Sequence, residues 1–340
     1  MKHVNIPIFI PHMGCPNQCV FCNQRSISGH MDFSLDDVRG EIETALSTVS
    51  ADTETEIAFF GGSFTGIERD LMINLLDIAQ EYIEAGRVSS IRLSTRPDYI
   101  NEEILDILSR YAVKTVELGL QSMDRAVLDA SKRGHGVECA EHACKMIKKK
   151  GFSLVGQMMI GLPGSTVETE IMTARKICDM GADGARIYPT VVFRDTELSD
   201  MMKSGKYIPL ELSDAVYRTK EALSVFAEAG VPCIRVGLCA GENLSSPDQA
   251  LGGANHSAIG ELAMSALYLD KIEKKIDALD EDISGKNIVI YVPRGDTSKV
   301  VGQKRSNIEK ITQKYSPRRI KVLEKDEILR YNIIIGFLDI

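Results

Sequence analysis

The sequence predicts an α/β protein, a partial (β/α)6 barrel followed by a small α+β module. Short β-rich segments alternate with segments of helical periodicity as far as residue 193, and the composition becomes strongly basic after residue 285. Strands that alternate with helices pair in parallel and are joined by right-handed crossovers. At 340 residues and 44% hydrophobic content, the chain can bury one large core and one small one.

Six segments have the short, apolar and β-rich character of strands. They cover residues 5–10, 56–62, 89–97, 114–122, 152–163 and 184–193. A helix is expected over 34–49, where Ser34 and Asp37 form a capping-box pattern, and another over 69–86, which ends in glycine. A pair of helices is expected between the fourth and fifth strands.

Three of the eight cysteines, Cys15, Cys19 and Cys22, follow the first strand with the spacing C-x3-C-x2-C. The N-terminus lacks the features of a signal peptide, and no apolar run is long enough to cross a membrane. We therefore expect a cytoplasmic protein, in which clustered cysteines bind metal or act in redox chemistry rather than forming disulfides.

Two metal sites fit this spacing. A structural zinc ion needs four ligands, and His12 or His30 could supply the fourth. An iron–sulfur cluster held by three thiolates instead leaves one iron open to a substrate or cofactor. Packing of the three thiols as small apolar groups is disfavoured because the loop has few apolar residues to bury them.

Polar and glycine residues follow the predicted strands, where α/β barrels place their functional groups. Two glycines after the second strand, Gly61 and Gly62, allow a close approach of backbone to a ligand and leave N–H groups free to bind it. Ser63 and Thr65 follow directly. An ordinary Gly-Gly turn is the alternative interpretation.

Arg96 ends the third strand, where its guanidinium could bind a carboxylate or phosphate in two-pronged fashion or form a surface salt bridge. Glu117 and Gln121 share one face of the fourth strand, and Gln157 lies on the fifth. A carboxylate inside an apolar strand needs a partner, for which we consider a ribose diol or Arg96.

The motifs "GCPNQCVFCNQ", "GGSFTG", "STRPD", "VELGLQS" and "GLPGST" occur in the order expected of radical S-adenosylmethionine (SAM) enzymes. Over about residues 1–270 the chain resembles the Elp3-like group of that superfamily. The resemblance implies a barrel of the radical SAM type and a 4Fe–4S cluster on Cys15, Cys19 and Cys22. It implies SAM contacts around Gly61–Thr65 and at Arg96, Glu117 and Gln121. From its place on the fifth strand, Gln157 is expected near the adenine. It also implies that SAM is reductively cleaved to a 5′-deoxyadenosyl radical, with an electron donor such as ferredoxin or flavodoxin.

The chain departs from Elp3 proper in two respects. Elp3 has a wider first cysteine spacing, and it continues into an acetyltransferase domain for which we expect no room after residue 285, so acetyl transfer is not carried over. The other five cysteines do not form a second ferredoxin-like set, and we interpret the first two of them, Cys139 and Cys144, as small buried hydrophobic residues. The five are Cys139, Cys144, Cys178, Cys233 and Cys239. One of the last two could approach the site.

The C-terminal part changes character. Residues 286–325 contain eleven Lys and Arg against three Asp and Glu, a net charge of +8. Because the whole chain has a net charge of −8, all other residues together carry −16. We expect a core over residues 1–270, a connecting helix or linker over 271–285 and a module over 286–340. Strands are predicted at 287–293, 318–324 and 331–337, with one helix over 298–315.

The segment "VVGQKRSNIEKI" resembles a KH RNA-binding motif, although Arg305 replaces the second glycine of its G-x-x-G loop. The charge excess favours an anionic partner, and RNA is the predicted one; a solvated basic face is the alternative. We therefore predict a radical SAM enzyme that modifies tRNA or rRNA. The rivals are a coproporphyrinogen-oxidase-like or haem-trafficking relative, and a non-catalytic RNA-binding protein with a structural metal site.

Overall fold

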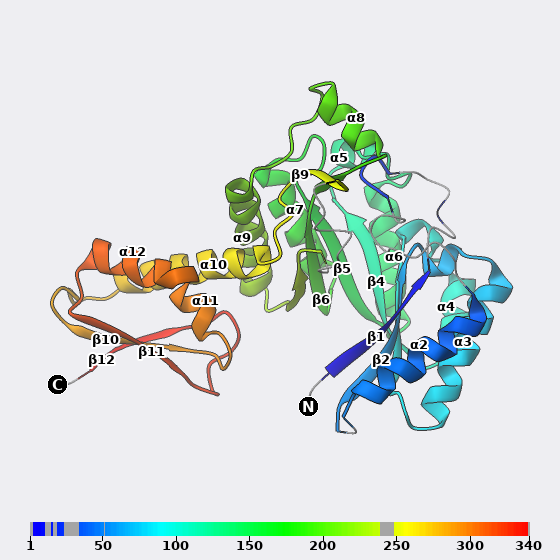
Figure 1. Ribbon diagram of the computed structural model, residues 1–340, viewed down its shortest axis with the longest axis horizontal. Helices are drawn as coiled ribbons and strands as arrows, with labels where there is room; N and C mark the ends of the chain where they lie inside the picture. Colours follow the sequence, from blue (N-terminus) through cyan, green and yellow to red (C-terminus); the bar gives the residue numbers. More distant parts are fainter. Residues whose placement is uncertain are drawn as a thin grey trace.

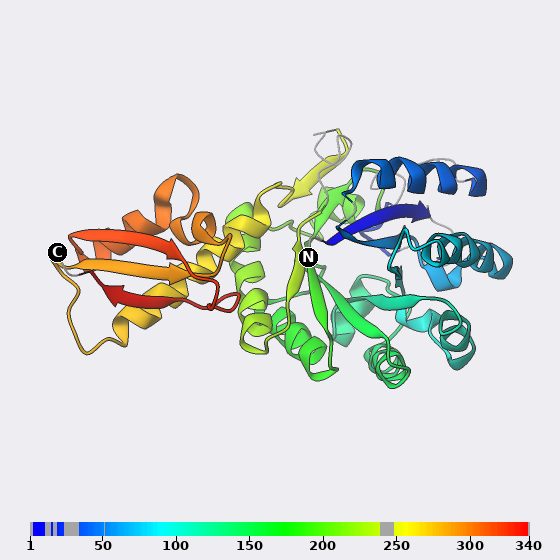
Figure 2. The same ribbon diagram turned by 90° about the horizontal axis from the view of Figure 1, so that it is seen from below.

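The computed structural model describes residues 3–10, 15, 19–23, 34–50, 52–238 and 248–338, apart from the side chain of residue 36. The core is a seven-stranded sheet in the order β1-β2-β3-β4-β5-β6-β8, and every neighbouring pair is parallel. Its strands are β1 His3–Ile10, β2 Glu54–Gly61, β3 Ser90–Thr95, β4 Val113–Gln121, β5 Ser153–Ile160, β6 Gly184–Pro189 and β8 Cys233–Val236. The strands form an arc with helices along its outer side (Figures 1 and 2). The predicted partial barrel is thus confirmed, with one more strand than expected.

The helices predicted over 34–49 and 69–86 and the pair between the fourth and fifth strands are all present. The helices of the core are α2 Leu35–Thr48, α3 Arg69–Glu84, α4 Glu102–Leu108, α5 Arg125–Ala130, α6 Val137–Lys149, α7 Val167–Asp179, α8 Glu197–Lys203, α9 Leu212–Glu228 and α10 Ile259–Asp277. Short 3-10 turns lie at η1 Phe64–Gly66 and η2 Pro97–Tyr99. Among the described residues, no helix is both long and apolar enough to cross a membrane.

The strand predicted over 184–193 is two strands. Pro189 ends β6, and β7 (Val191–Phe193) leaves the sheet to pair antiparallel with β9 (Ala250–Gly253). A proline has no N–H to continue a parallel ladder, which accounts for the break. The chain from β7 to α8 then lies above the carboxyl ends of the core strands (Figure 1).

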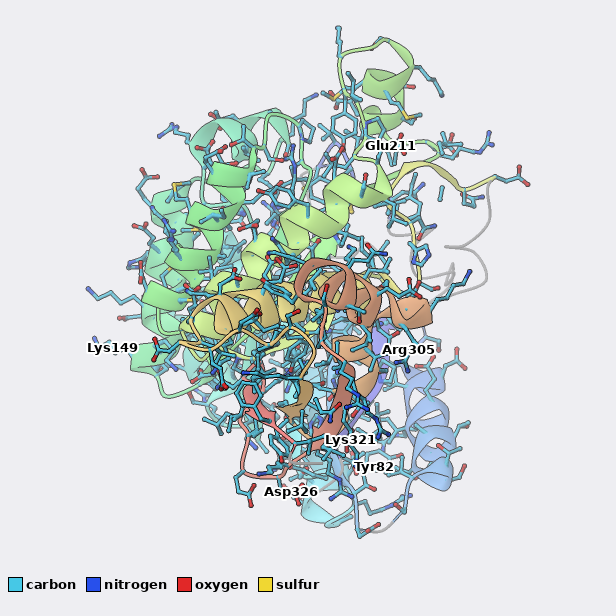
Figure 3. All side chains as sticks on the ribbon, turned by 90° about the vertical axis from the view of Figure 1, so that its left-hand side faces the viewer. Tyr82, Lys149, Glu211, Arg305, Lys321 and Asp326 are labelled. Carbon is cyan, nitrogen blue, oxygen red and sulfur yellow. The ribbon has the colours of Figure 1, made fainter. Side chains whose placement is uncertain are left out.

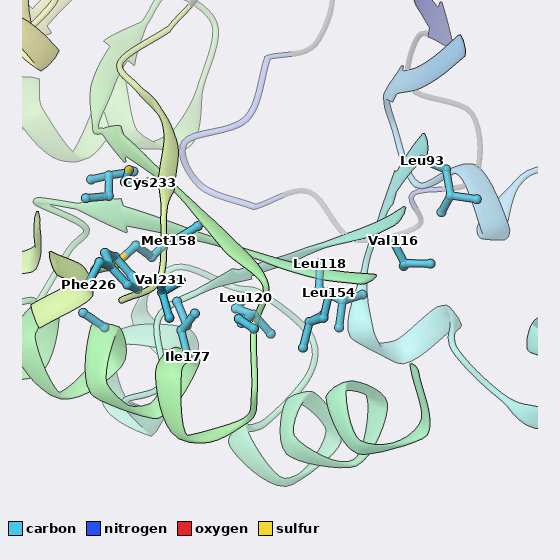
Figure 4. Close-up of a cluster of buried hydrophobic side chains, with 14 of the residues drawn as sticks. Leu93, Val116, Leu118, Leu120, Leu154, Met158, Ile177, Phe226, Val231 and Cys233 are labelled. Carbon is cyan, nitrogen blue, oxygen red and sulfur yellow. The ribbon is translucent and has the colours of Figure 1, made fainter. Parts of the chain in front are cut away.

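Alternation along the strands separates an apolar outer face from a polar inner one. In β4, Val116, Leu118 and Leu120 are fully buried against the helices. Figure 4 shows this layer, with Leu154 from β5 and Ile177 from α7 in the same cluster. Each such side chain contributes about 1.5–3 kcal/mol. The residues between them face the inside of the arc, which leaves that side for chemistry.

The C-terminal module has a three-stranded sheet covered on one face by helices (Figures 1 and 2). Its central strand β10 (Asn287–Val292) pairs parallel with β11 (Arg319–Glu324) and antiparallel with β12 (Ile334–Phe337). The helix predicted over 298–315 is broken into α11 Thr297–Val301, the turn η3 Gln303–Arg305 and α12 Ser306–Tyr315. Gly302 has a φ of 78°, which no continuous helix permits, and this explains the break.

Core and module share α10. Tyr268 on this helix hydrogen bonds to Asp296 of the module at 2.5 Å, and the amide of Asn307 donates to the carbonyl of Ser265 at 2.9 Å. Three of these four residues are at most 6% exposed, and Ser265 is 8% exposed. The domain boundary expected at residue 270 therefore falls inside one continuous helix, and the first part of the expected linker is helical.

Candidate cofactor site

The cysteine loop is fixed on both sides by segments distant in sequence. The N–H of Val20 donates to the carbonyl of Ser131, and the N–H of Leu198 donates to the carbonyl of Val20 at 2.8 Å. The Val20 side chain is 1% exposed and packs with Val192 and Leu198. The loop is therefore held between the turn that follows α5 and the start of α8.

The two glycines after β2 contact the end of β1, where the cysteine loop begins. Gly61 has a φ of 108°, and a Cβ there would lie 2.5 Å from the carbonyl oxygen of Ile10, so only glycine fits against the end of β1. The N–H of Gly62 donates to the same oxygen at 2.9 Å. The predicted close approach is present, but it is made to β1, and the prediction that both N–H groups are free is wrong for Gly62.

Ser63 and Thr65 take different positions. The Ser63 hydroxyl lies 3.5 Å from the sulfur of Cys15, which brings the second strand end to the cysteine loop. The Thr65 hydroxyl is hydrogen bonded to that of Thr95 at 2.7 Å and to the carbonyl of Tyr99 at 3.0 Å. Thr65 thus joins the ends of β2 and β3, and its contact with SAM stays a prediction.

Arg96 is a two-pronged carboxylate clamp, but the carboxylate belongs to this chain. Its Nε and Nη2 each lie 2.9 Å from an oxygen of Asp98. Its Nη1 lies 3.9 Å from the Cys19 sulfur, and the side chain is only 3% exposed. Burial acts to lower the pKa of Arg96, but the hydrogen bonds and charge of Asp98 outweigh it, so the pKa is raised and the cation is held beside the thiol.

A second buried arginine, which the sequence analysis did not single out, lies closer to the same thiol. Nη1 of Arg133 is 3.1 Å from the Cys19 sulfur, and Nη2 donates to the carbonyl of Gly119 at 2.5 Å. The side chain is 5% exposed. The only signal in the sequence is a basic residue before glycine in the loop between α5 and α6, which is too common to indicate a function.

Deeper in the arc, Glu117 is fully buried in a network of charges. Its carboxylate lies 2.9 Å from Nη1 of Arg92 and 2.8 Å from Nε of Arg186. Nε2 of Gln157 donates to it at 2.8 Å, and Arg92 also binds Glu56. The prediction that Arg96 is a partner of Glu117 is therefore wrong. The ribose contact stays a prediction, for a carboxylate that already has three protein partners.

Gln121 differs from the other predicted SAM contacts. Its Oε1 is buried and has no hydrogen-bond partner in the described part of the chain. The backbone φ of 67° turns the end of β4 at this residue. A buried acceptor without a partner costs about 1–3 kcal/mol, so this atom is suited to a ligand that donates a hydrogen bond.

The donor set fits a cluster with one open position. Cys15, Cys19 and Cys22 all have reduced thiols, and two buried guanidinium groups face Cys19, with one carboxylate bound to them among the described residues. An anionic cluster would compensate the second cation. Within the described ranges, no three His, Cys, Asp or Glu side chains converge as ligands of a single metal ion would. The alternative zinc ligands, His12 and His30, lie outside the described residues.

The remaining cysteines behave as small packing residues where they are described. Cys144 and Cys233 are buried, and burial raises the pKa of each thiol to about 12. Cys139 and Cys178 are half-buried on their helices, and burial raises the pKa of Cys178 to about 11. Cys239 lies outside the described residues.

Comparison with known families gives two adjoining matches. A model of the radical SAM superfamily matches residues 9–177, and a model of the radical SAM C-terminal domain matches residues 182–269. Among solved structures, archaeal Elp3 of Methanocaldococcus infernus with an N-terminal deletion matches with a TM-score of 0.62 at 23% identity. The match covers 81% of this chain and 63% of that one. At this identity it shows the fold.

Three curated relatives illustrate the sequence similarity. An uncharacterised protein of Methanocaldococcus jannaschii is 29% identical over 222 residues, which cover 62% of this chain and 68% of that protein. The tRNA uridine(34) acetyltransferase of M. infernus is 33% identical over 159 residues, or 45% of this chain and 28% of the relative. Elongator complex protein 3 of Schizosaccharomyces pombe is 27% identical over 252 residues, or 61% and 46%. The chain spans less than half the length of the last two relatives.

Proposed function

The chain belongs to the radical SAM superfamily, whose enzymes use a 4Fe–4S cluster and S-adenosylmethionine, and we propose that this enzyme modifies RNA, either tRNA or rRNA. The observation that carries the proposal is the pairing of two sites in one chain. One is the cysteine loop at the carboxyl ends of the strands, and the other is a basic module joined to it through α10.

In this proposal Cys15, Cys19 and Cys22 would hold the cluster, and residues at the ends of β2 to β5 would bind SAM. Together the two groups would supply a 5′-deoxyadenosyl radical for hydrogen abstraction from the substrate, given one electron from a donor such as ferredoxin or flavodoxin. Gly61 lets the end of β2 pack closely against the end of β1, where the cysteine loop begins. The unpaired Oε1 of Gln121 would accept a hydrogen bond from a donor on SAM.

The inner face of the arc gives the proposed site a surface of buried charged side chains with little access to water. Glu117 binds both Arg92 and Arg186, and the three side chains are at most 12% exposed, so their charges are balanced without solvent. The ring of Phe60 lies 5.4 Å from the Arg186 guanidinium and covers it. Fixed dipoles of this kind orient a reactant and exclude water from it.

RNA as the substrate rests on the module and on the relatives. Nine basic residues of the module are exposed and have no carboxylate partner within the described residues; they are Arg294, Lys304, Arg305, Lys310, Arg318, Arg319, Lys321, Lys325 and Arg330. Figure 3 shows Arg305 and Lys321 on the same side of the molecule. A cationic surface of this kind binds phosphate backbone. One relative is named for a tRNA uridine, but acetyl transfer is not part of this proposal.

The decisive experiment is anaerobic. The purified protein is reconstituted with iron and sulfide, then given SAM and dithionite, and 5′-deoxyadenosine is measured by mass spectrometry. We expect product from the wild type and none from a variant with Cys15, Cys19 and Cys22 all replaced by alanine. Added cellular tRNA or rRNA should raise the yield and acquire a mass change.

Two outcomes would contradict the proposal. Product formation that is unaffected by RNA, with haem retained on purification, would favour a tetrapyrrole relative. Zinc in place of iron, with RNA bound and no 5′-deoxyadenosine, would favour a non-catalytic RNA-binding protein.

A further inference from the structure

We propose that Arg133 is a positioning residue for the cluster: it holds the Cys19 thiolate and raises the reduction potential of the iron–sulfur group. The inference rests on cluster binding by Cys19 as proposed above, and it does not depend on RNA being the substrate.

The geometry of Arg133 is set by two contacts from opposite sides. One nitrogen of its guanidinium is bound to the carbonyl of Gly119 at the end of β4, and another lies 3.1 Å from the Cys19 sulfur. Its own carbonyl accepts a hydrogen bond from Nη2 of Arg96 at 2.5 Å. Two residues earlier, the carbonyl of Ser131 binds the N–H of Val20, next to Cys19. The Ser131–Arg133 turn therefore contacts the cysteine loop through both backbone and side chain.

Arg96 and Arg133 differ in whether a carboxylate balances their charge. The charge of Arg96 is neutralised by the two-pronged bond to Asp98. Arg133 has no carboxylate partner in the described part of the chain, although its side chain is 5% exposed. A buried cation without an anion is strongly unfavourable, so the position of Arg133 requires a negative group beside it. Among the described residues, the side chain that touches it and can carry negative charge is Cys19, as the thiolate ligand of the cluster.

The consequence for redox chemistry follows from electrostatics. One electron passes from the reductant to the cluster, so the reduced form carries one more negative charge, and no proton moves at Arg133. A fixed cation and an N–H donor at the ligand sulfur stabilise that extra charge, which raises the reduction potential. Burial makes the effect large because the interior screens the charge poorly.

The test is an anaerobic redox titration of the reconstituted protein, followed by the electron paramagnetic resonance signal of the reduced cluster. We compare Arg133→Gln, which removes the charge, with Arg133→Lys, which keeps it. The matched control is Lys132→Gln, one residue away, because Lys132 is 58% exposed and bound to Glu197 at the surface. Iron and sulfide contents are measured on every variant.

We expect the reduction potential of the cluster to be more negative in Arg133→Gln than in the wild type. The equilibrium constant for reduction should fall at least tenfold, which corresponds to about 59 mV for one electron. Arg133→Lys should shift less, and Lys132→Gln should match the wild type. Equal potentials for Arg133→Gln and the wild type would overturn the proposal, as would equal shifts at positions 132 and 133. If Arg133→Gln fails to retain iron, Arg133→Lys decides, because lysine cannot hold both Gly119 and Cys19. In that case a negative shift of Arg133→Lys as large as the tenfold change expected for Arg133→Gln, with the positive charge still present, would overturn the proposal.

Discussion

The interior of the barrel and the surface of the module use the same residue types in opposite ways. Glu117 is fully buried between Arg92 and Arg186, so each charge depends on its partners. Lys304 and Arg305 are exposed and have no acidic partner among the described residues. Buried charges fix a geometry at the expense of desolvation, whereas exposed cations remain available to a partner and are screened by salt.

The largest effect on stability is expected from a substitution that breaks the buried charge network around Glu117. Glu117→Gln keeps the shape of the side chain but leaves Arg186 without its carboxylate partner and Arg92 with Glu56 alone. We expect the free energy of unfolding to fall by about 3–5 kcal/mol, because an unpaired buried charge is left behind. The urea midpoint measures the loss. The control is Glu81→Gln, which breaks an exposed pair with Arg39 and should cost less than about 1 kcal/mol. Similar losses in the two variants would contradict the comparison.

A smaller effect is expected from pH. His135 is 9% exposed, and burial, with the charge of Arg133 and Arg96 nearby, lowers its pKa to about 4, against weaker opposing effects of the Gly136 backbone and Asp98. The unfolded chain binds a proton near pH 6.5 and the folded one does not, so stability present above pH 6.5 is lost as the pH falls toward 4. The complete shift is worth on the order of 3 kcal/mol.

Urea midpoints at pH 7 and pH 5 measure this dependence. Most carboxylates stay ionised over that interval, so the histidine dominates the change. His135→Gln should flatten the difference between the two midpoints. If the variant and the wild type lose the same stability, His135 is not held neutral by its surroundings.

The smallest expected effect concerns the module. Replacing Lys304 and Arg305 by alanine should weaken RNA binding and reduce the slope of log affinity against log salt by roughly 1.4, or about 0.7 for each single-strand phosphate that is no longer neutralised. Filter binding at several salt concentrations measures the slope. The matched control removes Lys145 and Lys149 from the exposed face of α6; Figure 3 shows Lys149 on the opposite side from Arg305. Equal slopes for both double variants would exclude the module surface as the place where RNA binds.

Much of the fold followed from local pattern. The alternation of strands and helices and the break in composition before the module are all visible in the sequence and appear in the structure. The misses have physical causes. Pro189 divides the predicted sixth strand, and Gly302 divides the predicted helix of the module. Both breakers were visible in the sequence, but apolar periodicity continued through them and outweighed them in the prediction.

The sequence by itself determined the chemistry that the site can support. It placed three thiols directly after the first strand, and it placed glycines and polar residues after the following ones, because ligand spacing and strand ends are local properties. Only the tertiary structure decided the partners. Arg133 meets Cys19 from 114 positions away, and Arg186 meets Glu117 from 69. Such contacts depend on strand order, register and the path of loops between elements. These are set by packing of the whole core and leave no local pattern in the chain.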